Sequence, residues 1–382
     1  MSTSPLPDGQ QVFVDAFGEN PPEAVEQHMR IATMPAPDPA TLQSHEIILR
    51  VHSASVNRVD LLMTSGQYQK MPSPPYTPGL EYSGEVVAAG SAVSHVSVGD
   101  AVLVDGMQAG ARSGGGYQTQ GGYAGYAVLP EVALHRIPAG LSFDEACCLL
   151  GNFETAYYAL VQRAQLQAGE TVLIHGASGS IGLSAVQIAK LLGATVIATS
   201  RSDEKLAVVK SLGADHVLNI AAPAGQSAVR RFRDDVKALT DGKGVHVVYD
   251  TVGGETSLES MRCVRFGARF LIVAWTSTPD VARGRGQRGA PRANHLPTNL
   301  MMMKGLNVLG CPTVIASENN PALRPRRVER LMQWAAEGRI QPRVAKAYPL
   351  ADYRTAMLDT WHSRVPGTCV LRPWDAASAG TP

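Results

Sequence analysis

The sequence predicts an α/β protein with two domains, one built on a doubly wound parallel sheet and one rich in β-strands. The chain has 382 residues, of which 45% are hydrophobic, and this is enough to form two separate cores. Short apolar runs separated by turn residues fill the first 150 residues, which is typical of β-strands. From about residue 151, apolar strands alternate with helical segments, which indicates βαβ units.

Residues 1–150 form the predicted β-rich domain. Strands are expected at 46–56, 82–90 and 101–104, because each is an apolar run that ends at Gly, Asp or a similar turn residue. The stretch 106–126 is rich in Gly and has no helical or strand period, so it is interpreted as a mobile loop.

Residues 151–299 form the predicted dinucleotide-type domain. In chain order, its strands are expected at 171–175, 195–199, 216–220, 245–250 and 269–275. Segments with helical composition separate the first four of these strands. Residues 300–382 are assigned to a C-terminal return to the first domain.

Composition excludes several classes of function. The formal net charge is +1 and no long basic run occurs, so nucleic acid is not an expected partner. The first ten residues lack the pattern of a secretory signal, and no run of about 18 apolar residues suggests a membrane span. The five cysteines are scattered and odd in number, which favours reduced thiols and a cytoplasmic location.

A glycine-rich turn follows the strand at 171–175. The residues are Gly176, Ala177, Ser178, Gly179, Ser180, Ile181 and Gly182. From Ala177 onward they match G-x-G-x-x-G with Ala in the first position, between a strand and a helix, which is the context that this motif requires. Gly179 would let the main chain approach a pyrophosphate, and Gly182 would let the helix pack on the strand. The free amides and dipole of the helix start favour phosphate. The alternative is an ordinary tight strand–helix turn.

The end of the next strand predicts which dinucleotide binds. An NAD site usually has an acidic residue there, but this strand ends in Ser200 and Arg201, with Lys205 one helical turn later. These side chains suit a 2′-phosphate, because a guanidinium can hold two phosphate oxygens. We therefore expect NADPH as the cofactor. In the alternative interpretation, Arg201 and Lys205 are solvated residues at a helix start.

Val252 and Gly253 follow the strand at 245–250. In doubly wound sheets, ligands bind at the carboxyl ends of the strands, so this turn is expected to line the cofactor site.

Motifs spread over about 45–372 resemble the medium-chain dehydrogenase/reductase superfamily, most closely its zinc-free quinone oxidoreductase branch. They are N-x-x-D at Asn57, Gly66-x-Tyr68, PYTPG at 75–79, GGYAGY at 121–126, the phosphate motif, and LGADHVLN at 212–219. The resemblance implies a GroES-like catalytic domain, a Rossmann domain and an active site in the cleft between them. It also implies a homodimer, with the strand at 306–310 as the pairing element.

The zinc ligands of related metalloenzymes are replaced in this chain. Asn57 stands where those enzymes have Cys, and Leu80 stands where they have His, which leaves Glu81 alone. A catalytic zinc usually needs three protein ligands, so no metal is expected.

The same resemblance assigns several site residues. Asn57 is placed beside the nicotinamide ribose, and its amide is also a candidate hydrogen-bond donor to the acceptor. Tyr68 is placed over the active site, where its hydroxyl would orient or protonate substrate. The alternatives are a turn-forming Asn and a half-buried aromatic residue. Thr155 is expected to approach the cofactor, and the main chain at Ala274 and Trp275 to contact the nicotinamide. The Trp275 side chain would either narrow the acceptor site or cap the core.

Together these features predict a zinc-independent, NADPH-dependent reductase of quinones or α,β-unsaturated carbonyls. Hydrogen-bond donors would stabilise the enolate-like or quinol oxyanion in place of a metal. An enoyl-thioester reductase is the second enzymatic alternative. The arginines of 281–295 are interpreted as a solvated flexible loop or, in the alternative that favours this enzyme, as a segment that recruits an anionic substrate such as a CoA thioester. A dinucleotide-binding structural or regulatory protein with little catalysis is the alternative from another class.

Overall fold

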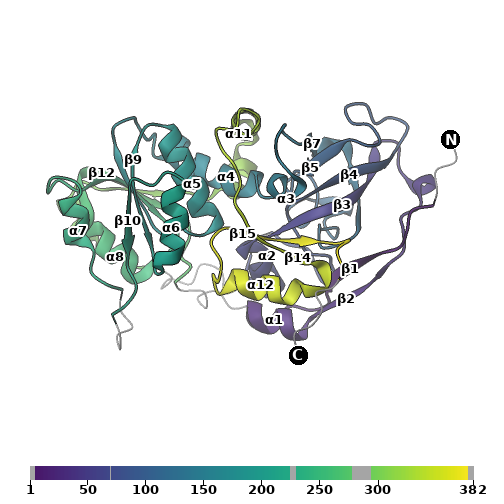
Figure 1. Ribbon diagram of the computed structural model, residues 1–382, viewed down its shortest axis with the longest axis horizontal. Helices are drawn as coiled ribbons and strands as arrows, with labels where there is room; N and C mark the ends of the chain where they lie inside the picture. The colour runs from purple at the N-terminus through teal and green to yellow at the C-terminus, as the bar shows by residue number, and fades with distance from the viewer. Residues whose placement is uncertain (1–4, 69, 224–228, 278–293, 377–382) are drawn as a thin grey trace. The chain divides into compact units, whose positions relative to one another are not determined.

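The structure is a computed structural model that describes residues 5–68, 70–223, 229–277 and 294–376. It divides into two compact units (Figure 1). The first contains the described residues up to Leu150 and those from Gln341 onward, and the second contains those from Gly151 to Ile340.

The second unit is built on a parallel sheet with the strand order β10-β9-β8-β11-β12-β13. These strands are β8 (Thr171–Ile174), β9 (Thr195–Ser200), β10 (His216–Asn219), β11 (Val245–Asp250), β12 (Val264–Ile272) and β13 (Asn307–Gly310). The chain adds strands outward from β8 on one side and then from β11 on the other, so the order reverses between β8 and β11. The doubly wound fold predicted from the alternating pattern is therefore confirmed.

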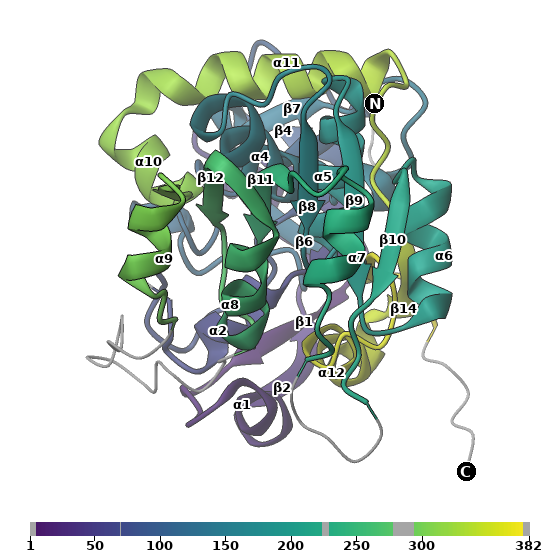
Figure 2. The same ribbon diagram turned by 90° about the vertical axis from the view of Figure 1, so that its left-hand side faces the viewer.

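Helices cover both faces of this sheet. The described helices of this unit are α4 (Leu150–Tyr157), α5 (Ser180–Leu191), α6 (Asp203–Ser211), α7 (Arg233–Ala238), α8 (Gly254–Cys263), α9 (Thr298–Met303), α10 (Thr313–Asn319) and α11 (Arg324–Ala336). Helices α5 and α6 lie on one face, and α7 and α8 lie on the other (Figure 1), while Figure 2 shows α9 and α10 beside β12. Because both faces are covered, β8, β9 and β11 are almost entirely buried and apolar.

The predicted boundary at residue 300 is wrong. Strand β13 pairs in parallel with β12, and the chain remains in the second unit until Ile340. The return to the first unit therefore begins at Gln341. The apolar pattern within one strand predicts that a strand forms there. It does not predict which sheet the strand joins, because tertiary contacts select the pairing partner.

The first unit contains a mixed sheet of described strands with the order β14-β15-β3-β4-β5-β7, and β6 pairs with β3. They are β3 (Glu46–Val56), β4 (Tyr82–Ala89), β5 (Ala101–Val104), β6 (Tyr126–Pro130), β7 (Leu134–Arg136), β14 (Val344–Pro349) and β15 (Thr368–Arg372). Its helices are α2 (Arg58–Thr64), α3 (Phe143–Ala146) and α12 (Tyr353–Trp361). The strands predicted at 46–56, 82–90 and 101–104 are confirmed within a residue.

The N-terminal segment is ordered into a hairpin-like pair that sequence reasoning did not detect. Strands β1 (Gly9–Val14) and β2 (Met29–Met34) pair antiparallel, with helix α1 (Pro21–Gln27) between them. Val12 and Val14 are completely buried in the core of this unit. Both ends of the Gly-rich stretch 106–126 pack inward, since Ala109 and Tyr123 are buried, whereas residues 114–116 between them are exposed.

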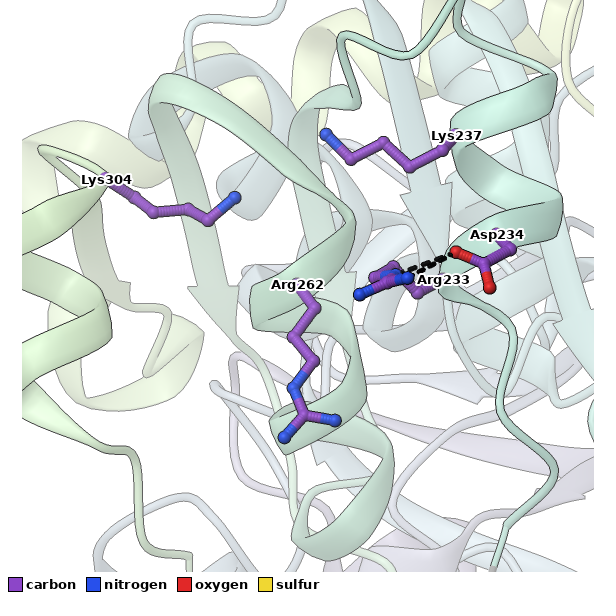
Figure 3. A pocket seen from close by; sticks show the side chains of 5 residues that line it. All are labelled: Arg233, Asp234, Lys237, Arg262 and Lys304. Carbon is purple, nitrogen blue, oxygen red and sulfur yellow. Dashed lines mark hydrogen bonds and ion pairs between the residues drawn. The ribbon is translucent and has the colours of Figure 1, made fainter.

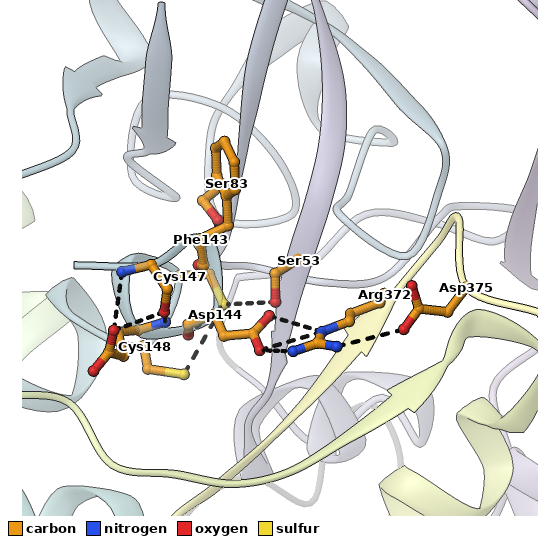
Figure 4. A network of polar contacts seen from close by, with 10 residues as sticks. Ser53, Ser83, Phe143, Asp144, Cys147, Cys148, Arg372 and Asp375 are labelled. Carbon is orange, nitrogen blue, oxygen red and sulfur yellow. Dashed lines mark hydrogen bonds and ion pairs between the residues drawn. The ribbon is translucent and has the colours of Figure 1, made fainter. Parts of the chain in front are cut away.

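A polar network anchors helix α3 to three strands of the first unit (Figure 4). The Asp144 carboxylate accepts hydrogen bonds from Arg372 of β15, with a shortest distance of 2.5 Å. Ser83 of β4 donates to the Phe143 carbonyl at 2.6 Å, and the Cys147 thiol lies 3.5 Å from the Ser53 hydroxyl of β3. This network fixes the segment that leads into α4.

Candidate functional site

The predicted cofactor residues of the second unit follow the carboxyl ends of four adjacent strands. The glycine turn follows β8, Ser200 ends β9 and Arg201 follows it, Val252 and Gly253 follow β11, and Ala274 and Trp275 follow β12. Because neighbouring parallel strands end at the same sheet edge, these segments share one edge, at the point where the strand order reverses. This is the usual ligand position in doubly wound sheets.

The three glycines of the turn differ in whether, and why, the fold needs a glycine at their position. Gly176 has a φ of +62°, and a Cβ there would lie 2.4 Å from the Thr251 hydroxyl oxygen. A Cβ on Gly182 would lie 2.3 Å from the Gly176 carbonyl oxygen, so this glycine permits close helix–strand packing. These two glycines are required by the fold itself.

Gly179 is different, because the described part of the chain does not require a glycine there. Its φ is −81°, and the nearest atom that a Cβ would meet is 3.5 Å away. The first helical bond of α5 runs from the Leu183 N–H to the Gly179 carbonyl at 2.9 Å, so the helix start directs its amide groups at this point. The geometry fits a residue that leaves room for a phosphate approaching the amides.

The end of β9 lies against this turn. The Ser178 and Ser200 hydroxyls are 3.0 Å apart, and the Ala177 N–H donates to the Thr199 carbonyl at 3.1 Å. Arg201 is exposed and Lys205 is half-buried. Burial and the nearby Arg201 charge lower the pKa of Lys205, while Glu204 opposes this shift. The structure therefore brings two cations together beside Ser200.

The turn after β11 is tied to the segment after β12. The Asp250 carboxylate accepts from the N–H groups of Val252 at 2.8 Å and Gly253 at 3.0 Å. The Ala274 N–H donates to the Asp250 carbonyl at 3.2 Å. Gly253 has a φ of +79°, and a Cβ there would meet Trp275 at 3.1 Å, while Trp275 itself is 48% exposed. The predicted neighbours are thus adjacent in space.

A buried histidine behind the glycine turn was missed by sequence reasoning. His175 is fully buried, and its two ring nitrogens lie 2.8 Å from the Thr199 hydroxyl and 2.6 Å from the Ser260 hydroxyl. Burial lowers its pKa to about 4, although the Asp250 charge opposes the shift. The neutral ring therefore links β8, β9 and α8. Its place directly before Gly176 was the only sequence signal.

Thr155 lies within α4, and its predicted approach to the cofactor stays a prediction. Its hydroxyl donates to the Gly151 carbonyl within α4 at 2.8 Å, and the residue is half-buried. The preceding Glu154 explains the unusual sequence here, because its buried carboxylate binds Arg324 at 2.6 Å and Arg327 at 2.9 Å on α11. This part of α4 is thus shaped by an internal ion-pair cluster.

Asn57 of the first unit stands at the start of α2, where its amide is already engaged. The Nδ2 group donates to the Ser55 hydroxyl at 2.7 Å and to the Glu81 carboxylate at 2.8 Å. A primary amide has two N–H hydrogens, and both are used in these bonds. The hypothesis that this NH₂ group donates to an acceptor does not fit the arrangement, which leaves Asn57 as an orienting residue.

Asp60 stabilises the turn that carries Glu81. Its carboxylate accepts from the Asn57 N–H at 2.9 Å and the Leu80 N–H at 3.0 Å. Burial raises the pKa of Asp60 to about 6, whereas the main-chain donors and the Arg112 charge lower it. The N-x-x-D spacing thus allows Asp60 to connect the start of α2 to residues 79–81 through hydrogen bonds.

Tyr68 lies in a small apolar cluster with Leu80. The cluster contains the buried residues Met63, Leu80 and Ala111, and the partly buried Val59, Tyr68 and Met71. The Arg112 guanidinium lies over the Tyr68 ring, 5.5 Å from its centroid, and its buried Nε has no hydrogen-bond partner among the described residues. A half-buried phenol beside a cation and an apolar wall can bind a conjugated carbonyl compound. Arg112 was not detected from the sequence.

Neither a metal cluster nor a membrane-spanning helix is found in the described part of the chain. Among the described residues, no group of three or more His, Cys, Asp or Glu side chains is arranged to hold a metal ion. None of the described helices combines the length and the apolar character needed to span a bilayer. The arginines predicted to recruit an anionic substrate, Arg283, Arg285, Arg288 and Arg292, lie outside the described residues.

The chain is similar to known oxidoreductases along most of its length. Residues 43–139 match the family "Alcohol dehydrogenase GroES-like domain", and residues 180–323 match "Zinc-binding dehydrogenase". A quinone oxidoreductase-like protein 2 homolog from Nematostella vectensis is 32% identical over 81% of this chain and 76% of its own length. The human quinone oxidoreductase is 28% identical over 90% of this chain and 92% of its own length.

A mycobacterial protein solved in complex with NADPH has the same fold. It superimposes with a TM-score of 0.74 at 26% identity, covering 96% of this chain and 100% of its own. The matched families identify the first unit as GroES-like and the second as a Rossmann-type α/β domain, as the resemblance implied. With these matches and the glycine turn at the strand-order reversal, the chain belongs to the medium-chain dehydrogenase/reductase superfamily, among quinone oxidoreductase-like members.

Proposed function

We propose that this chain is an NADPH-dependent reductase that delivers hydride to quinones or α,β-unsaturated carbonyls. The observation that carries the proposal is Gly179, a glycine that the described chain does not need, placed at the N-cap of α5, where the first-turn amide groups of a helix favour phosphate. Similarity to quinone oxidoreductases supports the reaction class. The reduced nicotinamide supplies the hydride, and the residues of this chain bind and orient it.

The preference for NADPH rests on the end of β9. Ser200 approaches the glycine turn through Ser178, and Arg201 and Lys205 lie close enough for their charges to interact. Two cations and a hydroxyl suit a 2′-phosphate, and a carboxylate at this strand end would repel one. The relative solved with NADPH supports the same assignment.

The acceptor is proposed to bind beside Tyr68. The phenol is the candidate donor to the oxyanion that forms when the acceptor is reduced, because the Asn57 amide hydrogens are engaged elsewhere. The Arg112 cation over the ring favours negative charge in its vicinity. Asn57, whose side chain also accepts from the helix start in a capping box, is proposed to lie beside the nicotinamide ribose and to orient it.

The reaction is proposed to proceed without zinc. Leu80 presents an apolar side chain, buried among Met63 and Ala111, where related metalloenzymes have a His ligand. Glu81 accepts a hydrogen bond from Asn57. These contacts support a role for Glu81 in positioning Asn57.

The function is tested by cofactor binding followed by turnover. NADPH and NADH are titrated by difference fluorescence, and NADPH oxidation is then followed with a panel of quinones, enones and crotonyl-CoA. We expect tighter binding of NADPH and turnover with quinones or enones that is insensitive to chelators. Tyr68→Phe should lower kcat more than it changes NADPH affinity. Cofactor binding with no turnover on the whole panel would instead support a regulatory protein, and turnover on crotonyl-CoA alone would support a thioester reductase.

We further propose a cytoplasmic homodimer that pairs through β13. This strand is the last in the order of the sheet, and Phe266, Met302 and Met303 nearby in the same unit are 80%, 73% and 70% exposed. None of the five cysteines is in a disulfide, which supports a reducing compartment. Light scattering should give twice the chain mass, and Phe266→Glu should shift it towards the monomer. A monomeric wild type would refute the pairing.

A further inference from the structure

A second charged site lies in the Rossmann-type unit, away from the glycine turn. It is a depression of about 460 Å³ lined by Arg233, Asp234, Lys237, Arg262 and Lys304 (Figure 3). Four of the five lining residues are basic. Lys237 comes from α7, Arg262 from α8 and Lys304 from the residue after α9, so three separate elements bring positive charge to one place.

This depression is at the amino edge of the sheet, opposite to the proposed dinucleotide edge. The Lys237 ammonium donates to the Lys243 carbonyl at 3.0 Å, two residues before β11 begins. The Lys304 ammonium donates to the carbonyl of Val264, the first residue of β12, at 3.1 Å. The glycine turn and the β11 turn follow the opposite ends of these parallel strands, so a ligand here would not compete with the dinucleotide.

The positive charges in the depression are incompletely neutralised. Arg233 pairs with Asp234 at 2.7 Å, and Arg262 pairs with Glu259 at 3.4 Å. Lys237 and Lys304 donate to neutral carbonyl groups, and no ion pair of theirs occurs among the described residues. Burial together with the Lys304 and Arg233 charges lowers the pKa of Lys237, as expected where cations converge.

The convergence is not a consequence of a generally basic surface. The whole chain carries a net charge of only +1, and the lining alone has four cations against one carboxylate. Nucleic acids are typically bound by an extended basic stripe, whereas this site is a local depression. Its volume exceeds that of one phosphate group, and two arginines and two lysines can surround several anionic oxygens.

We propose that this depression binds a small anion with a diphosphate group, at a site separate from the dinucleotide. The ammonium groups of Lys237 and Lys304 supply the charge that is not neutralised within the chain. Arg262 adds a guanidinium that its weak pairing with Glu259 leaves able to turn toward the anion. Asp234 opposes binding, both by its own charge and by holding Arg233.

Calorimetric titration of the full chain, with NADPH present to saturate the dinucleotide site, tests the proposal. Inorganic pyrophosphate and ADP are the probes, which distinguishes a free diphosphate from one on a nucleoside. The Lys237→Gln/Lys304→Gln double variant should bind the better probe about tenfold more weakly or worse. Arg326→Gln/Arg330→Gln, which removes two exposed charges from α11, should bind as the wild type does.

Asp234→Asn provides a test that a folding defect cannot imitate. The Asp234 side chain is 86% exposed, and its replacement removes the only carboxylate of the lining, so affinity should rise about threefold or more. Absence of saturable binding of either probe would overturn the proposal. The proposal would also be overturned if the double lysine variant bound the probe as tightly as the wild type does. The same holds if potassium chloride, at matched ionic strength, displaced the bound probe as well as the other probe does. The outcome does not depend on the reaction proposed above, since it is read from binding of the probe alone.

Discussion

The Asn57 amide donates to the Glu81 carboxylate at 2.8 Å, joining the start of α2 to the turn that precedes β4. Glu81 is 7% exposed, so this charge is held inside the domain by a hydrogen-bond donor. A buried charge is tolerated only where it is paired or hydrogen-bonded. The pair therefore keeps the Asn57 side chain in one orientation beside the proposed acceptor region.

Asn57→Asp should destabilise the protein because it places a second carboxylate against Glu81. We expect the free energy of unfolding to fall by about 2 kcal/mol and kcat/KM to fall about tenfold or more. Urea denaturation and steady-state kinetics measure the two effects. Adding Glu81→Gln to Asn57→Asp removes the like charge and should restore most of the stability. If the double variant is no more stable than Asn57→Asp, charge repulsion is not the cause.

The glycine turn offers a matched pair of substitutions. Gly182→Ala should destabilise the fold by at least about 2 kcal/mol, because its Cβ would lie 2.3 Å from a main-chain oxygen. Gly179→Ala should leave stability within about 0.5 kcal/mol of wild type, yet raise the Kd for NADPH about tenfold or more. Denaturation and fluorescence titration separate the two roles. Equal NADPH affinity in Gly179→Ala would remove the main support for the phosphate site.

Arg201→Asp tests the choice between the two dinucleotides. We expect the Kd for NADPH to rise about tenfold or more, because a carboxylate would repel the 2′-phosphate that Arg201 is proposed to bind. The Kd for NADH should change by less than about threefold. Arg330→Asp makes the same charge change on an exposed position of α11 and serves as the control. Equal weakening of both dinucleotides would contradict the assignment of Arg201.

His175 should make stability depend on pH. Its pKa is lowered to about 4 in the folded chain, below its ordinary value near 6.5, so the unfolded chain binds a proton first as the pH falls. Its contribution to stability is therefore present above pH 6.5 and is lost as the pH falls towards 4. Between about pH 7 and pH 5 the loss should be about 2 kcal/mol. His175→Gln should reduce this dependence in urea denaturation.

Asp60→Asn provides the opposing comparison. The pKa of Asp60 is raised to about 6 by burial, so the folded chain binds the proton more readily and gains stability as the pH falls from about 7 to 5. Removing this gain should make the acid loss steeper, by about 1 kcal/mol over the same interval. If both variants change the pH dependence in the same direction, at least one of these pKa shifts is misassigned.

Much of the fold could be predicted because local pattern and tertiary structure agree. Strand β3 spans the predicted residues 46–56, and β8 to β12 follow the predicted alternation, since apolar runs must be buried whichever partner they find. The N-terminal pair β1 and β2 was missed because its strands are short and lie among prolines and polar residues. The boundary at 300 was misplaced because β13 is a strand by pattern, while its partner β12 is selected by packing.

The features of the candidate site that could be predicted are those formed by residues close together in the sequence. The glycine turn could be recognised from the sequence, and so could Ser200 and Arg201 at the strand end where NAD sites usually have an acidic residue. The family resemblance added that Leu80 stands where related metalloenzymes have a His ligand. Only the tertiary structure decided that the Asn57 hydrogens are taken by Ser55 and Glu81, that His175 is a buried neutral link, and that four cations converge at the amino edge of the sheet. The physical reason is that a hydrogen bond or a charge interaction depends on distances of a few ångströms between residues far apart in sequence, and only the folded chain sets those distances.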